Sequence, residues 1–270
     1  MNVTFLEKLS GLRAQKSSVL CVGLDPDPEK MPVHLLKKYS VSEAVRVFCE
    51  QIIATTSPFA VAYKINFAFF EALGDECTQV MRSVLKSIPD EILTIADAKR
   101  GDIGNSASFY AKSVFKDLGF DSVTVSPYMG KDSLLPFLNY PKTCTFALAR
   151  TSNAGGNDFQ LLDVGGEPLY VNVAKKVASW AATTPGTAGL VVGATDVNSM
   201  ANLRIMLPEV PFLIPGVGSQ GGSASEVMSA SGSGPVLINS SRSILFASAG
   251  QDFAQKAAEI AQITQEELGK

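Results

Sequence analysis

The sequence is poor in the two residue types that most often build cross-links and metal sites. It holds four cysteines, Cys21, Cys49, Cys77 and Cys144, without a CxxC pair, and a single histidine, His34. Wide spacing and apolar neighbours indicate buried, reduced thiols instead of a disulfide framework. One histidine gives little support to a histidine-based triad or a histidine-rich metal site. We expect His34 to lie at the surface or at a helix start.

An excess of one charge and long apolar runs are also missing. The 23 basic and 26 acidic residues give a formal net charge of -3, and a chain without a basic excess is poorly suited to nucleic acid. No stretch approaches the ~18 apolar residues of a membrane span, and the opening segment MNVTFLEKLSGLRAQKSS indicates a short amphipathic helix without the apolar region of a signal peptide. The prediction is a cytoplasmic protein that binds neither nucleic acid nor membranes.

Short apolar segments, in contrast, recur along the whole chain. Eight of them have the composition of strands, at residues 19–25, 60–66, 93–99, 122–127, 145–151, 188–194, 212–218 and 235–241. Continuous apolar strands are typical of parallel sheets that are covered on both faces. Helical patterns lie between them, which predicts an α/β fold, a (β/α)8 TIM barrel of one domain over residues 1–270 with a preceding N-terminal helix. An open doubly wound sheet is the alternative, but no G-x-G-x-x-G follows the first strand.

Charged residues gather where these strands are predicted to end. The segment ADAKRGDIGNSA places Asp97, Lys99, Arg100 and Asp102 directly behind the apolar run EILTI. Asp97 and Lys99 are two positions apart on a strand, so both are expected to face the barrel interior at its rim. Charges in that place need partners, either each other or Lys64 in YKINFAFFE. An ion pair that only closes the barrel is an alternative for Asp97 and Lys99, and a surface lysine is one for Lys64.

The segment PGVGSQGGSASE after the seventh strand has the composition of a phosphate-binding loop. Small residues let backbone N–H groups approach an anion, and Ser223 with Glu226 forms a capping box that marks a helix start. In a (β/α)8 barrel the loops after strands seven and eight often bind phosphate. Arg242, which follows strand eight, would add a charge-assisted contact.

The segment ARTSNAGGND follows the fifth strand and is rich in neutral polar side chains, among them Ser152. Such a loop suits a lid or a contact to a ring. The local composition by itself favours an ordinary turn.

Together these motifs resemble those of the orotidine 5′-phosphate decarboxylases. The resemblance rests on DAKRGDI, on the lysine in YKINFAFFE, and on GLDPDP, RTSN and PGVGSQGG, and it covers nearly the whole chain. DAKRGDI is the most specific of these motifs. Two positions depart from the family's usual pattern, because Ile65 follows Lys64 where proline is usual and Ser241 precedes Arg242 where many members have glycine. The resemblance implies decarboxylation of orotidine 5′-monophosphate (OMP) to UMP and CO₂.

The resemblance also implies a set of site residues. An alternating charge array would consist of Lys64, Asp97, Lys99 and Asp102. Substrate contacts would come from Asp25, Ser106, Ser152, Gly218, Gln220, Ser241 and Arg242. Asp25, Lys64 and Ser106 would serve the ribose and Ser152 the pyrimidine. The phosphate would bind to Gln220 and Arg242, with backbone groups around Gly218 and Ser241 nearby.

The expected chemistry explains why charges would gather in this array. Loss of CO₂ from C6 of the orotate ring leaves an anion on an sp² carbon, and a fixed ammonium group stabilises that anion as it develops. The resemblance implies that Lys99 has this role and then protonates C6, so that neither a cofactor nor a metal is needed. Asp97 would hold Lys99 and crowd the departing carboxylate. The resemblance further implies a homodimer in which Asp102 reaches the neighbouring site.

Two other functions fit parts of the pattern. A barrel decarboxylase that acts on a sugar phosphate such as 3-keto-gulonate 6-phosphate shares the D-x-K-x-x-D motif but uses Mg²⁺. A non-catalytic protein that binds a phosphate ligand is the other alternative, because a fold does not fix a function. Retention of Lys99 beside its carboxylates argues against the second.

Overall fold

Eight strands form a closed barrel in the order β1 to β8. The computed structural model describes residues 3–217 and 223–269. The strands are β1 (Leu20–Leu24), β2 (Ala62–Asn66), β3 (Leu93–Arg100), β4 (Ser122–Val125), β5 (Cys144–Arg150), β6 (Thr187–Val192), β7 (Phe212–Pro215) and β8 (Val236–Ser240). Each lies within one of the predicted segments or overlaps it closely, so the predicted (β/α)8 barrel is confirmed. The predicted N-terminal helix is α1 (Phe5–Lys16).

The described residues group into two compact units, and two of the strands belong partly to one unit and partly to the other. Unit 1 consists of Met1–Ser10 and Ala98–Ile238, and unit 2 of Gly11–Asp97 and Asn239–Lys270. One of the three boundaries falls within α1, and the other two fall within β3 and β8, close to the carboxyl ends of these strands. The predicted site residues are therefore distributed over both units.

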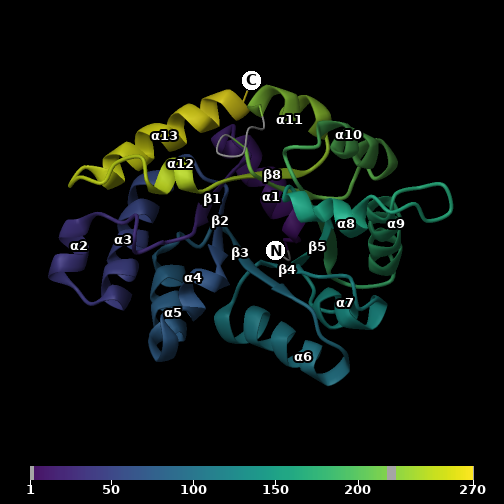
Figure 1. The fold of residues 1–270 in the computed structure, drawn as a ribbon, viewed down its shortest axis with the longest axis horizontal. Coiled ribbons are helices and arrows are strands. Elements are labelled where there is room, and N and C mark those ends of the chain that lie inside the picture. Colours follow the sequence, from purple (N-terminus) through teal and green to yellow (C-terminus); the bar gives the residue numbers. More distant parts are fainter. Residues whose placement is uncertain (1–2, 218–222, 270) are drawn as a thin grey trace. The chain divides into compact units, whose positions relative to one another are not determined.

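Helix α3 organises the packing of unit 2. The helices of this unit are α2 (Val33–Lys38), α3 (Val41–Thr56), α4 (Phe67–Glu71), α5 (Cys77–Ser87), α12 (Arg242–Leu245) and α13 (Phe253–Leu268), with a 3-10 turn η1 (Gly74–Glu76). One face of α3 is buried, and α3 packs against α5 and α13 (Figure 1). The ring of Phe48 stacks on those of Phe246 and Phe253, with centroids 6.0 and 5.2 Å apart. Such offset aromatic pairs add stability beyond the area they bury.

Unit 1 is built on the same pattern of strands followed by helices. Its helices are α6 (Gly104–Lys112), α7 (Lys131–Leu138), α8 (Asn157–Gln160), α9 (Leu169–Ala181), α10 (Val197–Met206) and α11 (Ala224–Ser231), with a π-helical turn η2 (Ser113–Leu118) and a 3-10 turn η3 (Ala154–Gly156). The capping residue Ser223 accepts a hydrogen bond from the N–H of Glu226 at 3.5 Å, which confirms the predicted start of α11. Phe5 of α1 packs edge to face on Phe146 of β5. Helices α6 and α7 lie against each other (Figure 1).

A buried arginine joins α10 to the strands that follow it. The guanidinium of Arg204 donates hydrogen bonds to the carbonyls of Leu207, Pro208, Val210 and Pro235 at 2.8 to 3.1 Å. It also lies 3.7 Å from the centroid of the Phe212 ring. Burial lowers the pKa of Arg204 to about 10. Because these carbonyls belong to loops that enter β7 and β8, Arg204 stabilises the end of these strands away from the predicted site.

Three of the four cysteines are buried, as predicted, and all four are free thiols. The prediction is wrong for Cys77, which is the first residue of α5 and is partly exposed. Apolar neighbours in sequence do not bury a side chain at a helix start, because the first turn faces solvent on several sides. His34 is the second residue of α2, as expected for a helix start. Within the described residues, none of the helices has both the length and the apolar character that crossing a membrane requires.

Candidate functional site

Lys64 is held between two carboxylates in unit 2. Its Nζ lies 2.8 Å from Oδ2 of Asp97 and 3.6 Å from Oδ1 of Asp25. The parallel register of β1, β2 and β3 sets Gly23 beside Lys64 and Asn66 beside Asp97, so the three charges meet toward the carboxyl ends of neighbouring strands. Lys64 is 4% and Asp97 8% exposed. The alternative of a surface lysine is therefore wrong, and Lys64, one of the two partners that the sequence left open for Asp97, forms an ion pair with it.

Electrostatics keep this lysine charged although it is buried. Burial on its own would lower the pKa of Lys64, but the charges of Asp25 and Asp97 and the hydrogen bond to Asp97 together raise its pKa above the ordinary value. With one ammonium and two carboxylates, the trio carries a net charge of about -1 when all three groups are ionised. Oδ1 of Asp25 is buried and accepts no hydrogen bond within the described part of the chain. A buried carboxylate oxygen without a donor is suited to a ligand hydroxyl.

The carboxyl end of β8 lies next to β1 in the same unit. Asn239, which is 6% exposed, donates from Nδ2 to Oγ of Ser241 at 3.1 Å, and its Oδ1 lies 3.6 Å from Sγ of Cys21. Arg242 follows as the exposed first residue of α12. Of the predicted phosphate contacts, Ser241 and Arg242 are thus adjacent at the end of β8. Gly218 and Gln220 lie outside the described residues.

The end of β3 belongs to unit 1 and departs from regular strand geometry. Lys99 has a φ of +44°, in the left-handed region that side chains other than glycine rarely adopt. Its backbone N–H donates to Oγ1 of Thr124 on β4 at 3.0 Å. The expectation that Lys99 and Asp97 both face the barrel interior at its rim depends on regular strand geometry, which ends at this residue. Lys99 is exposed while Asp97 is buried, because the turn of the backbone at Lys99 ends the two-residue alternation on which that inference depends.

Asp102 and Ser106 follow in the segment that leads into α6. Asp102 is half-buried, and its Oδ1 accepts a hydrogen bond from the N–H of Ile103 at 2.8 Å. Ser106 is exposed in the first turn of α6. Both side chains thus lie beyond the end of β3, Asp102 in the connection to α6 and Ser106 within α6 itself.

The loop that carries Ser152 is anchored by Arg150, which the sequence reasoning missed. Arg150 is the last residue of β5 and is buried. Its guanidinium binds Asp196 at 3.0 Å, Asn157 at 2.9 Å and Gln160 at 3.3 Å, so it ties the segment after β5 to the start of α10. Ser152 itself is half-buried two residues further on. The sequence did contain a signal for Arg150. It is a charged residue at the end of an apolar strand, directly before a polar loop.

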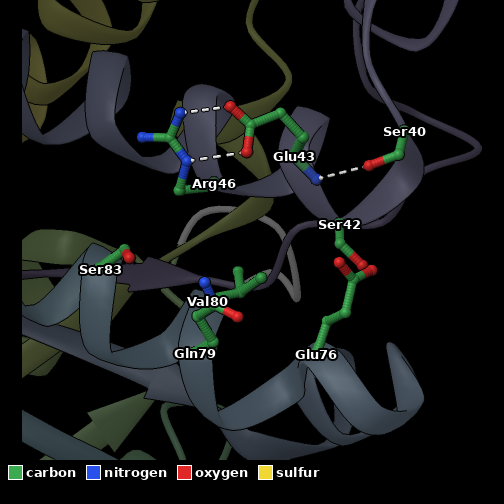
Figure 2. A pocket seen from close by; sticks show the side chains of 8 residues that line it. All are labelled: Ser40, Ser42, Glu43, Arg46, Glu76, Gln79, Val80 and Ser83. Atoms are coloured by element: carbon green, nitrogen blue, oxygen red, sulfur yellow. Dashed lines mark hydrogen bonds and ion pairs between the residues drawn. The ribbon is translucent and has the colours of Figure 1, made fainter.

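A separate cavity of about 240 Å³ lies between the first turns of α3 and the facing side of α5 (Figure 2). Its lining is Ser40, Ser42, Glu43, Arg46, Glu76, Gln79, Val80 and Ser83. The guanidinium of Arg46 is engaged by the carboxylates of Glu43 and Glu50. No predicted site residue lines this cavity, and its one basic residue, Arg46, is already paired with Glu43 and Glu50.

The comparison with known families decides how these charges are to be interpreted. Residues 18–257 match the model of the orotidine 5′-phosphate decarboxylase / HUMPS family. The chain belongs to this family. It is 47% identical over 264 residues to an orotidine 5′-phosphate decarboxylase from Dehalococcoides mccartyi, a match that covers 95% of this chain and 94% of that protein. It is 45% identical over 261 residues to one from Herpetosiphon aurantiacus, with 96% and 95% covered.

Solved structures of this family share the barrel. The structure of Leishmania donovani OMP decarboxylase is 36% identical with a TM-score of 0.83, over 98% of this chain and 99% of that one. Leishmania donovani UMP synthase is 37% identical with a TM-score of 0.84, over 99% of this chain and 57% of that one. The matches to the two curated relatives cover 94% and 95% of their length, so this chain spans nearly the full length of both.

Proposed function

We propose that this chain decarboxylates OMP to UMP and CO₂ without a cofactor or a metal ion. The observation that carries the proposal is the buried Lys64 between Asp25 and Asp97, with Lys99 two residues beyond Asp97 on the same strand. The net negative charge of the trio favours a second ammonium group nearby. Its curated relatives are named for this reaction.

Lys99 is the group that stabilises and protonates C6. The bond between C6 and the carboxylate carbon breaks, its electron pair stays on C6, and CO₂ leaves. The ammonium of Lys99 stabilises this anion and then gives it a proton, and the resulting amine recovers a proton from water. Asp97 holds the ammonium groups in place and adds a smaller contribution by crowding the departing carboxylate.

The remaining contacts orient the nucleotide. Asp25 accepts a hydrogen bond from a ribose hydroxyl, a role supported by its buried Oδ1, which lies 3.6 Å from Nζ of Lys64 but accepts no hydrogen bond within the described residues. Lys64 holds Asp25 for this contact, and Ser106 supplies a further hydroxyl group near the ribose. Ser152 binds the pyrimidine from the loop that Arg150 anchors.

The direct test of this function is a spectrophotometric assay of OMP with purified protein, with and without EDTA. Loss of the substrate's absorbance that is insensitive to EDTA supports the proposal. Activity that EDTA abolishes and Mg²⁺ restores would favour the sugar-phosphate decarboxylase mechanism. Binding of OMP without turnover would favour a ligand-binding protein.

Arg242, with Gln220 and the backbone around Gly218 and Ser241, binds the phosphate. Arg242→Ala should lower kcat/KM for OMP by about tenfold or more, because a charge-assisted contact is lost. The matched control substrate is orotidine, which has no phosphate. An equal loss on both substrates would show that Arg242 is structural and that the phosphate assignment is wrong.

We further propose a two-fold symmetric homodimer in which Asp102 serves the neighbouring site. Support comes from exposed apolar side chains on the segments around it, namely Ile103, Phe109, Tyr128 and Met129, of which Tyr128 is 85% exposed. Large exposed apolar side chains are frequent at protein interfaces. Ile103 directly precedes α6 and Phe109 lies within it, whereas Tyr128 and Met129 lie in the loop between β4 and α7; α6 packs against α7.

Mixed dimers test the shared site. Lys99→Ala and Asp102→Ala homodimers should each be nearly inactive. After equal mixing and free exchange, half of the dimers are mixed and one of their two sites is intact, so activity should recover to about a quarter of wild type. If native mass spectrometry shows mixed dimers while activity stays at the level of the separate variants, Asp102 does not serve the neighbouring site.

Two broader proposals complete this function. Residues 1–270 form one barrel domain, which is supported by a single family model that spans residues 18–257. The protein is cytoplasmic, which is supported by its four free thiols, because reduced cysteines are typical of that compartment.

A further inference from the structure

The backbone turn at Lys99 is held by a side chain of the neighbouring strand. Lys99 has a φ of +44°, and its N–H donates to Oγ1 of Thr124 on β4 at 3.0 Å. A residue with a Cβ is strained in this region, and such strain persists only where the surrounding structure imposes it. The hydroxyl oxygen of Thr124 contributes to that constraint, because it accepts the N–H of the strained residue itself.

Further contacts fix the two residues that follow Lys99. The N–H of Ser126, directly after β4, donates to the carbonyl of Arg100 at 2.7 Å. A Cβ on Gly101 would lie 3.3 Å from Cβ of Ser126, so the backbone at Gly101 packs closely against the same residue. The guanidinium of Arg100 lies 5.0 Å from the centroid of the Tyr110 ring on α6. The end of β3 is therefore held by β4 and by α6, all within unit 1.

The acceptor of the Lys99 N–H belongs to a strand that is buried along its whole length. Thr124 is 1% exposed and every residue of β4 is buried, whereas Lys99 is exposed. A functional group that is supported by packed strands is positioned more precisely than one on a loop. The hydrogen bond thus ties an exposed lysine to a rigid part of unit 1.

A second threonine of the same sheet serves as a comparison. Thr145 of β5 is the register neighbour of Val123, the residue before Thr124, and it is also 1% exposed. Its Oγ1 is buried without a hydrogen-bond partner in residues 3–217 and 223–269. A buried threonine of this sheet can therefore lack any partner, so the bond between Lys99 and Thr124 does not follow from burial alone.

We propose that Thr124 is a positioning residue for the reaction, and that its hydroxyl oxygen holds the left-handed turn from which the ammonium group of Lys99 extends. Side chains alternate in direction only along a regular strand, so the turn sets the direction in which the Lys99 side chain leaves β3. The role of Lys99 at C6 rests on the proposed function. The competing explanations are that Thr124 only stabilises the fold, or that it contacts the nucleotide itself.

Amide hydrogen exchange tests the turn independently of catalysis. The Lys99 N–H, followed by NMR, should be protected in the wild type and should exchange at least about tenfold faster in Thr124→Val, which has nearly the same shape but no acceptor. Thr124→Ser keeps the acceptor and should keep the protection. Thr145→Val is the matched control and should leave the Lys99 N–H unchanged. Equal exchange in the wild type and Thr124→Val would show that this bond does not hold the turn.

Steady-state kinetics test the consequence for the reaction. Thr124→Val should lower kcat for OMP by about tenfold to a hundredfold, because misplacement of a reacting group by about 1 Å has effects of this size. The KM for OMP and the Kd for UMP should stay within about threefold, because other residues bind the nucleotide. Thr124→Ser should restore kcat to within about threefold of wild type, and Thr145→Val should not change it. Thr124→Ala, which also lacks the acceptor, gives the same test if the valine variant does not fold.

The outcomes separate this inference from the proposed function. If wild type does not turn over OMP, the proposed function is wrong, while hydrogen exchange still tests the turn. If wild type is active and Thr124→Val has a lower Tm but an unchanged kcat, Thr124 serves stability alone. A raised Kd for UMP would instead show that Thr124 contacts the nucleotide. Either of these two results would overturn the inference and leave the proposed function intact.

Discussion

Replacement of Lys64 by methionine is the most direct test of the buried trio. The substitution keeps most of the apolar stem and removes the ammonium group that separates Asp25 from Asp97. Two carboxylates are then left in a site where Asp97 is 8% exposed. Removing one partner of a buried ion pair destabilises a protein by about 3–5 kcal/mol. We expect a loss of this size in the free energy of unfolding.

The variant should also acquire a dependence on pH that the wild type lacks. In the wild type the folded-state pKa of Lys64 is raised, so its contribution to stability is complete below pH ~10.4 and is lost only at higher pH. In Lys64→Met, repulsion between the carboxylates should make the folded state bind one more proton than the unfolded state. The free energy of unfolding should then fall as pH rises from 5 to 8, by at most about 1.4 kcal/mol per pH unit.

Urea unfolding at several pH values measures both effects. The matched variant is Lys64→Met with Asp97→Asn, in which one carboxylate is left and the slope should disappear. Lys256→Met is the surface control, because its ion pair with Glu259 is exposed and its loss should leave the free energy of unfolding nearly unchanged. A loss below about 1 kcal/mol together with a flat pH profile for Lys64→Met would refute the description of these charges as a buried, coupled group.

Three further predictions concern residues outside the trio. Lys99→Gly and Lys99→Ala should both abolish turnover. In urea unfolding the glycine variant should be more stable by about 1 kcal/mol, since only glycine adopts a φ of +44° without strain. Equal stabilities of the two variants would contradict this. Arg204→Met should lower the free energy of unfolding by about 3 kcal/mol and leave kcat of the folded enzyme unchanged, and a loss of kcat would place this residue in the site. Arg150→Leu should raise KM about tenfold by releasing the loop of Ser152, and a lower Tm with unchanged KM would assign it to stability alone.

The fold could be predicted because its strands differ strongly from their surroundings in composition. Each strand is an apolar run bounded by polar residues, and burial on both faces removes the ambiguity of alternating patterns. That Asp97 pairs with a nearby ammonium group was also predictable, since a charge in an apolar strand needs a partner, and Lys64 was one of two lysines left open for this contact. The fold and this ion pair could both be inferred from where apolar and charged residues lie along the sequence.

Other features depend on backbone geometry or on partners distant in sequence. Nothing in the residue type of Lys99 indicates a left-handed backbone. This conformation occurs near the end of β3, where the backbone N–H of Lys99 donates to Oγ1 of Thr124. The environment of Asn239 combines groups from β1 and β8, over 200 residues apart along the chain. The signal in the sequence was a polar residue within the apolar run PVLINSS, which identifies a buried polar group but not what it contacts.

The exposure of Cys77 makes chemical labelling of this protein selective. Cys21, Cys49 and Cys144 are buried, and burial raises the pKa of each of these thiols. Only Cys77, at the start of α5, is accessible to a thiol-reactive dye under native conditions. A preparation of one variant can therefore carry one fluorophore per chain without any engineered cysteine. Energy transfer between donor-labelled and acceptor-labelled chains would then report subunit exchange in real time, independently of catalysis.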